Sequence, residues 1–406
     1  MTETTERTRI RRESSGETGE YGPVRGDEEL RTHARNMAWS FHGKDEDFLE
    51  AFARYGTDKL RVLRDGGRPV AGLSLLPLGQ WFGGRSLPMG GISLVGVAPE
   101  QRGRGAGRRL MTAVVREMKE AGTPISVLYP AKQTLYRRAG YELAGGRWET
   151  SIGASDIDGG SRKGDVREIE ESDRPAVEAA YRAFASRHSG PIDRPDFMWT
   201  RLEQPRAGRA RGFLVEGDEG VEGYAHLYET QSENYHYDLN LTDFVATTNR
   251  AASRLLGFLA DHASLGHTVR WCGDPLDPVH ALLTEQKYRI RLLFRWMIRI
   301  VDVKDALEGR GYPPELEGEL HFEIDDDIVD ENRGRFVLEV SDGTASLQPG
   351  GRGRIRTGIR GLGTIYTGFF SPRKAEIAGL LTGPDEDLED AGRVFSGPVP
   401  WMTDMF

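Results

Sequence analysis

The chain has 406 residues, and at about 150 residues per domain this length predicts two or three domains. Hydrophobic residues make up 38% of it and charged residues 29%, a composition that excludes global disorder and supplies several buried cores. The formal net charge of −9 argues against a general nucleic-acid-binding protein, the single cysteine excludes an intrachain disulfide, and the apolar runs are too short to cross a membrane.

The first 22 residues are polar and charged, and they contain no apolar stretch of the kind found in secretory signals. Because few of these side chains could join a core, we predict a flexible N-terminal tail over residues 1–22. The absence of a signal or a membrane span predicts a cytoplasmic protein.

Two seams rich in glycine, proline and charge interrupt the chain, at residues 153–164 and 302–319. The segments between them have the size of ordinary domains. We therefore predict three domains after the tail, over residues 23–152, 165–301 and 302–406.

The first domain alternates strand and helix signals. Its clearest helix covers residues 106–121, because Leu110, Val114 and Met118 recur on one face. Asp65 to Gly67 is typical of a hairpin turn. The expected helices are 27–39, 106–121 and 132–138, and the expected strands are 60–63, 69–76, 92–98, 124–129, 141–144 and 147–152.

The second domain repeats this order of elements, although the residues themselves are little alike. Its expected helices are 174–187, 250–263 and 278–286, and its expected strands are 212–216, 221–228, 240–246, 268–272 and 293–301. The third domain differs, because strands come first and a helix begins at Ser371-Pro372. Its expected strands are 319–324, 334–341, 344–348 and 353–357.

The strongest local motif lies between an apolar strand and the helix at 106–121, where Arg102-Gly103-Arg104-Gly105-Ala106-Gly107 joins them. Small residues leave main-chain N–H groups uncovered, and a helix N-terminus favours negative charge. The motif therefore predicts a site for a pyrophosphate. The flanking strand and helix argue against a disordered, RNA-binding glycine-arginine run.

The glycine spacing at 103, 105 and 107 differs from that of a dinucleotide fold, and no Gly-Lys-Ser/Thr ending of a P-loop follows. Arg102, Gly105 and Gly107 instead form the R-x-x-G-x-G pattern of the GNAT acetyltransferases. Val95 to Pro99 resembles the fourth strand of that family and its exit, and Leu135 to Tyr141 resembles its last helix and strand.

As a whole, the chain resembles the Eis family of multi-acetylating N-acetyltransferases. The resemblance covers nearly everything after residue 22 and implies a fold that is α/β and α+β. It consists of two tandem GNAT-like domains, each a mixed central sheet with flanking helices, and a C-terminal sterol-carrier-protein-like α+β domain. The second GNAT-like domain lacks the phosphate loop. The resemblance also implies acetyl-CoA as co-substrate, no metal, and a homo-oligomer that is a hexamer.

The resemblance assigns roles residue by residue. Tyr136 would protonate the departing thiolate, and the carboxylate of Phe406 would serve as base. At Ala131 the family has a serine, so a hydroxyl contact with the cofactor is lost. The expected cofactor-binding residues are Val95, Gly96, Val97, Arg102, Gly103, Arg104, Gly105, Ala106, Gly107, Arg108, Ala131 and Lys132.

Three features of the mechanism stay open from the residues alone. The oxyanion donor is expected near Val97, freed by a bulge or splay at Gly96, although Gly96 is equally consistent with ordinary packing. A carboxylate with a reference pKa of about 3.5 is a weak base toward an ammonium of about 10.4, so Phe406 is either a true base or an electrostatic anchor. Asp404 would add a second negative charge.

These residues predict an N-acetyltransferase acting on small cationic amines or on lysine side chains, with no nucleic acid or membrane as partner. The alternative is a non-catalytic acyl-CoA-binding sensor or scaffold. A third interpretation makes the last domain a lipid carrier, which would require an apolar cavity. His262 and His267 are five residues apart, which is a poor spacing for a metal pair.

Overall fold

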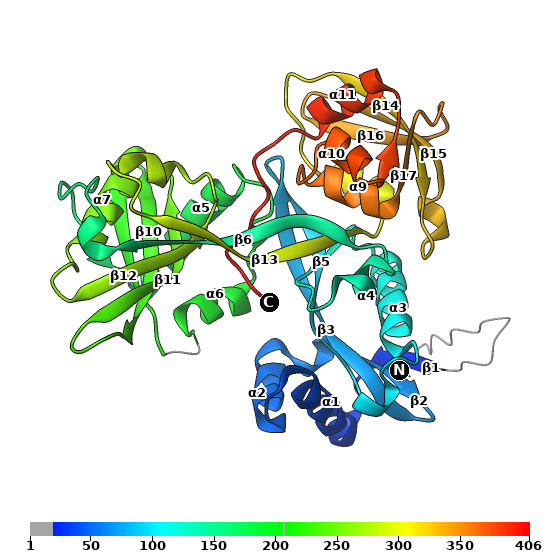
Figure 1. The fold of residues 1–406 in the computed structure, drawn as a ribbon, viewed down its shortest axis with the longest axis horizontal. Coiled ribbons are helices and arrows are strands. Elements are labelled where there is room, and N and C mark those ends of the chain that lie inside the picture. The colour runs from blue at the N-terminus through cyan, green and yellow to red at the C-terminus, as the bar shows by residue number, and fades with distance from the viewer. Residues whose placement is uncertain (1–18, 206–207) are drawn as a thin grey trace.

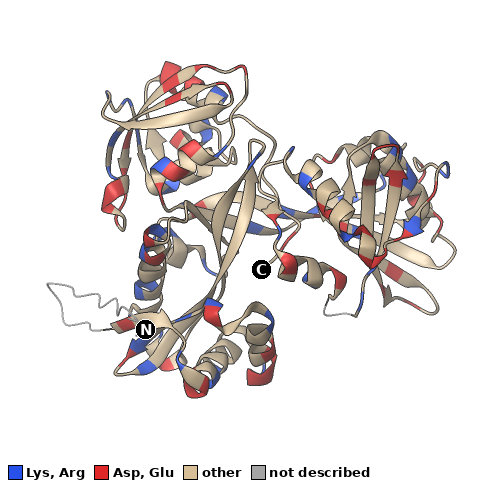
Figure 2. Cartoon of the chain, turned by 180° about the vertical axis from the view of Figure 1, so that it is seen from behind, with Lys and Arg blue, Asp and Glu red and all other residues tan. Residues whose placement is uncertain are grey.

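The computed structural model describes residues 19–205 and 208–406, which form three units (Figure 1). We call residues 19–156 the first unit, 167–300 the second and 303–406 the third. Within these described ranges, no helix is both long enough and apolar enough to cross a membrane. Red and blue segments alternate on all three units in Figure 2, so charges of both signs are mixed.

The first unit follows the expected alternation. Its helices are α1 (Gly26–Phe41), α2 (Asp45–Tyr55), α3 (Ala106–Glu120) and α4 (Gln133–Arg137). Its strands are β1 (Gly19–Pro23), β2 (Leu60–Asp65), β3 (Arg68–Phe82), β4 (Arg85–Val97), β5 (Ile125–Leu128) and β6 (Glu142–Gly153).

The second unit repeats part of this order. Its helices are α5 (Arg174–Ala185), α6 (Asp196–Glu203) and α7 (Asn249–Ala260). Its strands are β7 (Arg167–Glu168), β8 (Ile192–Asp193), β9 (Arg211–Gly217), β10 (Gly220–Gln231), β11 (Tyr237–Ala246), β12 (Gly266–Gly273) and β13 (Arg289–Ile300).

The third unit has a separate sheet in the order β16-β15-β14-β17-β18. Its strands are β14 (Gly318–Asp325), β15 (Gly334–Ser341), β16 (Thr344–Pro349), β17 (Ile355–Gly358) and β18 (Leu381–Thr382). Its helices are α8 (Val303–Gly309), α9 (Ile359–Tyr366), α10 (Pro372–Ile377) and α11 (Asp385–Val394).

The first two units share one continuous sheet, with the order β1-β2-β3-β4-β5-β13-β6-β12-β11-β10-β9-β7. β13 inserts between β5 and β6, pairing antiparallel with both. β6 continues onward to pair with β12. The last strand of the second unit therefore completes the sheet of the first, a long-range exchange that the sequence pattern does not predict.

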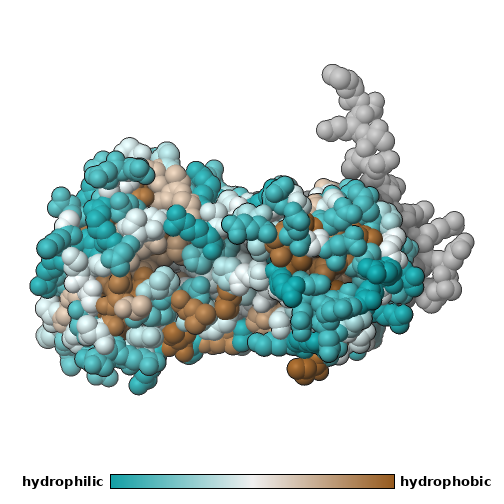
Figure 3. Space-filling model, turned by 90° about the horizontal axis from the view of Figure 1, so that it is seen from above, coloured by the Kyte–Doolittle hydropathy of each residue, from teal (hydrophilic) through white to brown (hydrophobic). Residues whose placement is uncertain are grey.

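α3 attaches to this sheet through its apolar face, where Leu110, Met111, Val114 and Val115 are fully buried. Each such side chain contributes about 1.5–3 kcal/mol relative to exposure. Apolar residues on the face drawn in Figure 3 form separate brown patches bordered by teal polar ones. The burial of α3 puts one apolar core between this helix and the sheet.

Three predictions need correction. The flexible N-terminal tail predicted over residues 1–22 is wrong for residues 19–22, because they belong to β1, which pairs with β2. Residues 1–18 of that prediction lie outside the described residues. The pieces at 141–144 and 147–152 are one strand, β6. The helix expected at 278–286 is only a 3₁₀ turn over Pro278–Leu282.

Candidate active site

β4 and β5 lie parallel for only a few residues and then separate. β5 pairs with Met89–Ile92 of β4 and with no later residue of that strand. Immediately after this point Leu94 has a φ of 50°, and the register with β3 shifts between Gly72 and Ser74. This β-bulge changes the direction of the last residues of β4. Because β5 no longer pairs with them, these residues have one free edge.

The uncovered edge presents the main chain of Val97. Ala98 donates its N–H to the Val70 carbonyl of β3 at 2.9 Å. Because successive amides of a strand point to opposite edges, the Val97 N–H faces the gap left by β5. The Val97 carbonyl on that edge accepts a hydrogen bond from Arg102 Nε at 3.3 Å.

Gly96 itself is not the bulge. It stays in register with Gly72, and a Cβ at this position would lie 2.2 Å from Cε of Met37. Close packing against α1 therefore explains the glycine. The bulge expected at Gly96 is formed instead by the two preceding residues, Leu94 and Val95.

The glycine-arginine motif forms the turn that the sequence predicts. Gly103 and Gly105 have φ values of 78° and 84°, and a Cβ at either would meet no heavy atom within 4 Å. No side chain caps the N-terminus of α3, and its first turn holds no acidic residue. The first amides of α3 are therefore free to receive an anion.

A cleft of about 1070 Å³ opens beside this turn. All the predicted cofactor-binding residues line it except Arg104, whose exposed side chain lies outside. Its described lining contains six basic residues and no Asp or Glu: Arg102, Arg108, Arg109, Arg116, Lys132 and Arg138. This excess of positive charge suits a polyanionic ligand.

Three basic residues of the cleft, Arg109, Arg116 and Arg138, are absent from the expected cofactor-binding set. Arg116 follows Arg108 by two helical turns of α3, with Thr112 between them, and all three line the cleft. That spacing was a readable signal. Arg138 follows α4 within the Leu135 to Tyr141 segment, which was already part of the motif.

Tyr136 lies on α4, and its side chain is buried among apolar residues that pack against α3. Its hydroxyl has no hydrogen-bond partner among the described residues, and its ring meets Tyr141 edge-on at 6.3 Å. Burial raises the pKa of Tyr136 to about 12. The phenol therefore keeps its proton at neutral pH, although it does not line the cleft.

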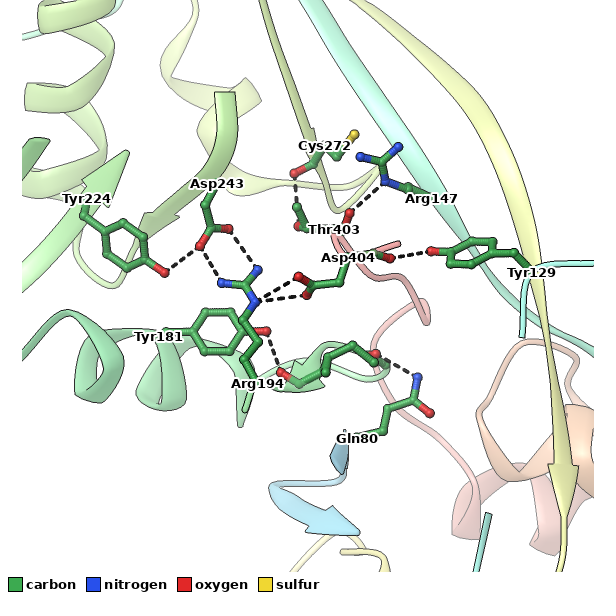
Figure 4. A network of polar contacts seen from close by, with 12 residues as sticks. Gln80, Tyr129, Arg147, Tyr181, Arg194, Tyr224, Asp243, Cys272, Thr403 and Asp404 are labelled. Carbon is green, nitrogen blue, oxygen red and sulfur yellow. Dashed lines mark hydrogen bonds and ion pairs between the residues drawn. The ribbon is translucent and has the colours of Figure 1, made fainter. Parts of the chain in front are cut away.

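Residues 398–406 run from the rest of the third unit into the junction between the first two. From here on, "the tail" means this C-terminal segment. Gly146 and Trp401 form a parallel bridge. Arg147 Nε donates to the Thr403 carbonyl at 2.7 Å, and Tyr129 Oη donates to the Asp404 carbonyl at 2.8 Å. Figure 4 shows these bonds converging on the tail from β6 and from the end of β5.

Phe406 is buried at the end of this path. A Cβ at Gly91 would lie 3.1 Å from its ring, and its ring centroid is 6.0 Å from that of Tyr129. Gly91 is one residue before the last β4–β5 pair. Phe406 therefore reaches the place where the two strands begin to separate.

Tyr136 and Phe406 belong to different apolar clusters of the described structure. Asp404 does not offer a free charge, because its carboxylate is buried against Arg194 Nε at 3.0 Å. Burial raises the pKa of Asp404, while Arg194 opposes that rise. The expectation that Asp404 adds a second negative charge for a cationic substrate is wrong.

Two other predicted features can be placed. Within residues 19–205 and 208–406, no three His, Cys, Asp or Glu side chains gather as a metal site would require. One cavity of the third unit, about 560 Å³, is open, and its lining mixes charged residues, among them Glu323, Arg333 and Arg356, with the apolar Leu380 and Leu381. This mixed lining does not provide the apolar cavity that the carrier interpretation requires.

Comparison with known proteins matches each unit to a family. Residues 23–144 and 190–300 match two acetyltransferase (GNAT) domains, and residues 303–403 match a sterol carrier protein domain. The N-acetyltransferase Eis of Mycobacterium tuberculosis is 29% identical over 373 residues, which cover 86% of this chain and 89% of that protein.

Solved structures match over nearly the full length. A GCN5-related N-acetyltransferase from Anabaena variabilis is 33% identical with a TM-score of 0.91, covering 96% of this chain and 100% of that one. One from Kribbella flavida is 31% identical with a TM-score of 0.83, covering 96% and 98%.

Proposed function

Because the chain belongs to the GCN5-related N-acetyltransferase family, has the domain order of Eis and is an acyltransferase, we propose that it transfers acetyl groups from acetyl-CoA to primary amines of cationic substrates. These are aminoglycoside-like or polyamine molecules, or lysine side chains. The observation that carries the proposal is the basic cleft beside the uncapped start of α3.

The cleft offers separate contacts for the diphosphate and for the pantetheine arm of the cosubstrate. The amides of Ala106, Gly107 and Arg108 bind the diphosphate, and the surrounding arginines neutralise its charge. The free edge of β4 at Val95–Val97 pairs with the amide groups of the pantetheine arm. With the arm bound in this way, the thioester would lie in the gap between β4 and β5, and the Val97 N–H would stabilise negative charge on its carbonyl oxygen.

In the reaction, the amine nitrogen attacks the thioester carbon and the carbon–sulfur bond breaks. Tyr136 donates its proton to the departing sulfur, for which its raised pKa of about 12 keeps it protonated. The carboxylate of Phe406 accepts the ammonium proton, directly or through a water. The buried ring of Phe406 near Gly91 supports this role, because it anchors the last residue where β4 and β5 begin to separate.

The test is amine-dependent thiol release by the purified chain, with polyamines, an aminoglycoside and lysine peptides as acceptors. We expect release well above the hydrolysis blank with at least one acceptor. Tyr136→Phe should lower kcat by about 10²-fold or more while acetyl-CoA binding is kept. Tyr312→Phe is the matched control, because the hydroxyl of Tyr312 is also buried but belongs to the third unit.

The same assay separates the enzyme from the alternative of an acyl-CoA sensor. Acetyl-CoA binding with no release for any acceptor would favour the sensor. A wild-type rate in Tyr136→Phe would show that Tyr136 is not the general acid. The assignment as a transferase would still stand.

A further inference from the structure

Arg194 is the buried hub between the second unit and the tail (Figure 4). Its side chain is 1% exposed and lies between the carboxylates of Asp243 and Asp404, which are equally buried. Nη1 is 2.6 Å from Asp243 Oδ2, and Nε is 3.0 Å from both carboxylate oxygens of Asp404.

The second unit holds Arg194 rigidly. The guanidinium lies 3.8 Å from the ring centroid of Tyr181 and 5.1 Å from that of Trp199. Tyr224 Oη donates to Asp243 at 2.7 Å, which orients that carboxylate in turn. Two adjacent rings and a fixed carboxylate leave the guanidinium little freedom to turn.

The backbone at Arg194 is also tied to the first unit. The preceding strand β8 pairs with β3, where Gly79 and Gln80 face Asp193 and Ile192. Tyr181 Oη donates to the Ile192 carbonyl at 2.6 Å. Contacts with both units therefore fix the backbone position of Arg194 independently of the tail.

Within the part of the chain that the structure describes, the other polar contacts of the tail involve its main chain or the Thr403 hydroxyl. Among the described residues, Asp404 provides the one ion pair of the tail. The contacts from Arg147 and Tyr129 reach main-chain carbonyls. Phe406 follows Asp404 by two residues, so the direction of the last residues depends on how the Asp404 side chain is held.

We propose that Arg194 is a positioning residue that fixes the carboxylate of Phe406 through Asp404. The second unit, whose helix α7 is capped by its own Thr248 instead of opening a phosphate loop, thereby completes the acceptor site of the first unit. This inference rests on the proposed role of Phe406 as base.

The experiment is a double-mutant cycle in the full chain. It combines Arg194→Met with a Gly-Ser extension after Phe406, which converts the Phe406 carboxylate into an amide. Arg194→Met alone should lower kcat/KM for the amine about 10²-fold, the size expected when a reacting group is misplaced by about 1 Å. The Kd for acetyl-CoA should stay within twofold. In the extended chain, Arg194→Met should cause no further loss.

Arg310→Met serves as the matched control. Arg310 is also buried among aromatic rings, but it lies in the third unit and bonds to the carbonyls of Gly311 and Tyr366. It should leave the amine kinetics unchanged. Arg194→Lys should restore part of the lost rate. If Arg194→Met fails to fold, Asp404→Asn removes the same ion pair with little change in shape and should give the same loss.

Each outcome has one meaning. In one outcome, the extension abolishes activity while Arg194→Met and Asp404→Asn both keep wild-type kinetics. This result would overturn the inference about Arg194 and would leave Phe406 as the base. Equal losses from Arg194→Met with and without the extension would indicate a merely structural role and also overturn it. An extension without effect would instead remove the proposed base.

Discussion

Tyr129 Oη donates a hydrogen bond of 2.8 Å to the main-chain carbonyl of Asp404, joining the first unit to the tail. Tyr129 directly follows β5, the strand whose departure from β4 opens the cleft. Its ring also lies beside that of Phe406. Burial raises the pKa of Tyr129 well above its ordinary value, so the hydroxyl remains a donor. One side chain thus links the splayed sheet to the proposed base.

Replacement of Tyr129 by Phe should weaken catalysis without affecting the cosubstrate. The change leaves a buried carbonyl unpaired at a cost of about 1–3 kcal/mol, and part of this cost appears as displacement of the tail. We expect kcat/KM for the amine to fall about tenfold, with the acetyl-CoA KM unchanged in steady-state kinetics. Tyr312→Phe removes a comparable bond in the third unit and should leave both constants alone. Unchanged amine kinetics would contradict the link.

Gly105→Ala should weaken acetyl-CoA binding by more than its backbone strain alone would cause. The φ of 84° costs an alanine about 1–2 kcal/mol, and its methyl group would project into the open space of the cleft. We expect the acetyl-CoA KM to rise about tenfold.

Gly122→Ala is the matched control for this change. Gly122 follows the other end of α3, has a φ of 69°, and equally meets nothing within 4 Å. It carries the same strain without lining the cleft. Equal effects of the two substitutions on KM would argue against the turn as the phosphate site.

Arg108 and Arg104 should differ in their effect on acetyl-CoA. Both are exposed arginines of the same motif, but only Arg108 lines the cleft. Loss of a charged contact is worth about 1.5–3 kcal/mol, so Arg108→Gln should weaken acetyl-CoA binding at least tenfold. Arg104→Gln should change it less than twofold. Titration calorimetry at two salt concentrations measures both, and a reversed order would contradict the placement of the diphosphate.

His33 should make the fold sensitive to mild acid. It is fully buried and stacked on Phe52, and burial lowers its pKa to about 4. Between pH 6.5 and 4 the unfolded chain binds a proton there and the folded chain does not, so the free energy of unfolding falls as pH falls. The loss amounts to about 3 kcal/mol.

Denaturant unfolding at several pH values checks this expectation. His33→Leu should reduce the pH dependence over that window by the stated amount. His226, whose pKa burial also lowers to about 4, provides a second site where the same reduction is expected. An unchanged slope in His33→Leu would show that the ring titrates normally in the folded chain.

The sequence predicted the local elements of the first unit well, because α3 and β4 carry strong patterns of their own. The motif from Val95 to Arg108 correctly indicated a strand, a turn and a helix with an uncapped start. The apolar residues Phe48, Leu49 and Phe52 of α2 also gave a helical signal, which was overlooked.

What could not be predicted depends on contacts between distant residues. No periodicity reveals that β13 inserts between β5 and β6, because both neighbours lie more than a hundred residues earlier. Arg194 stands in a short segment between a two-residue strand and α6, where an arginine usually faces solvent. Its role depends on Asp243 and Asp404, which only the folded chain brings to it.

The proposed function requires acetyl-CoA in the basic cleft and the Phe406 carboxylate as the base for the amine. It is tested most directly by measuring amine-dependent thiol release for the wild type and for the chain extended by Gly-Ser after Phe406. Extension should lower kcat/KM for the amine by about 10²-fold, while the Kd for acetyl-CoA should stay within twofold. A fully active extended chain would contradict it.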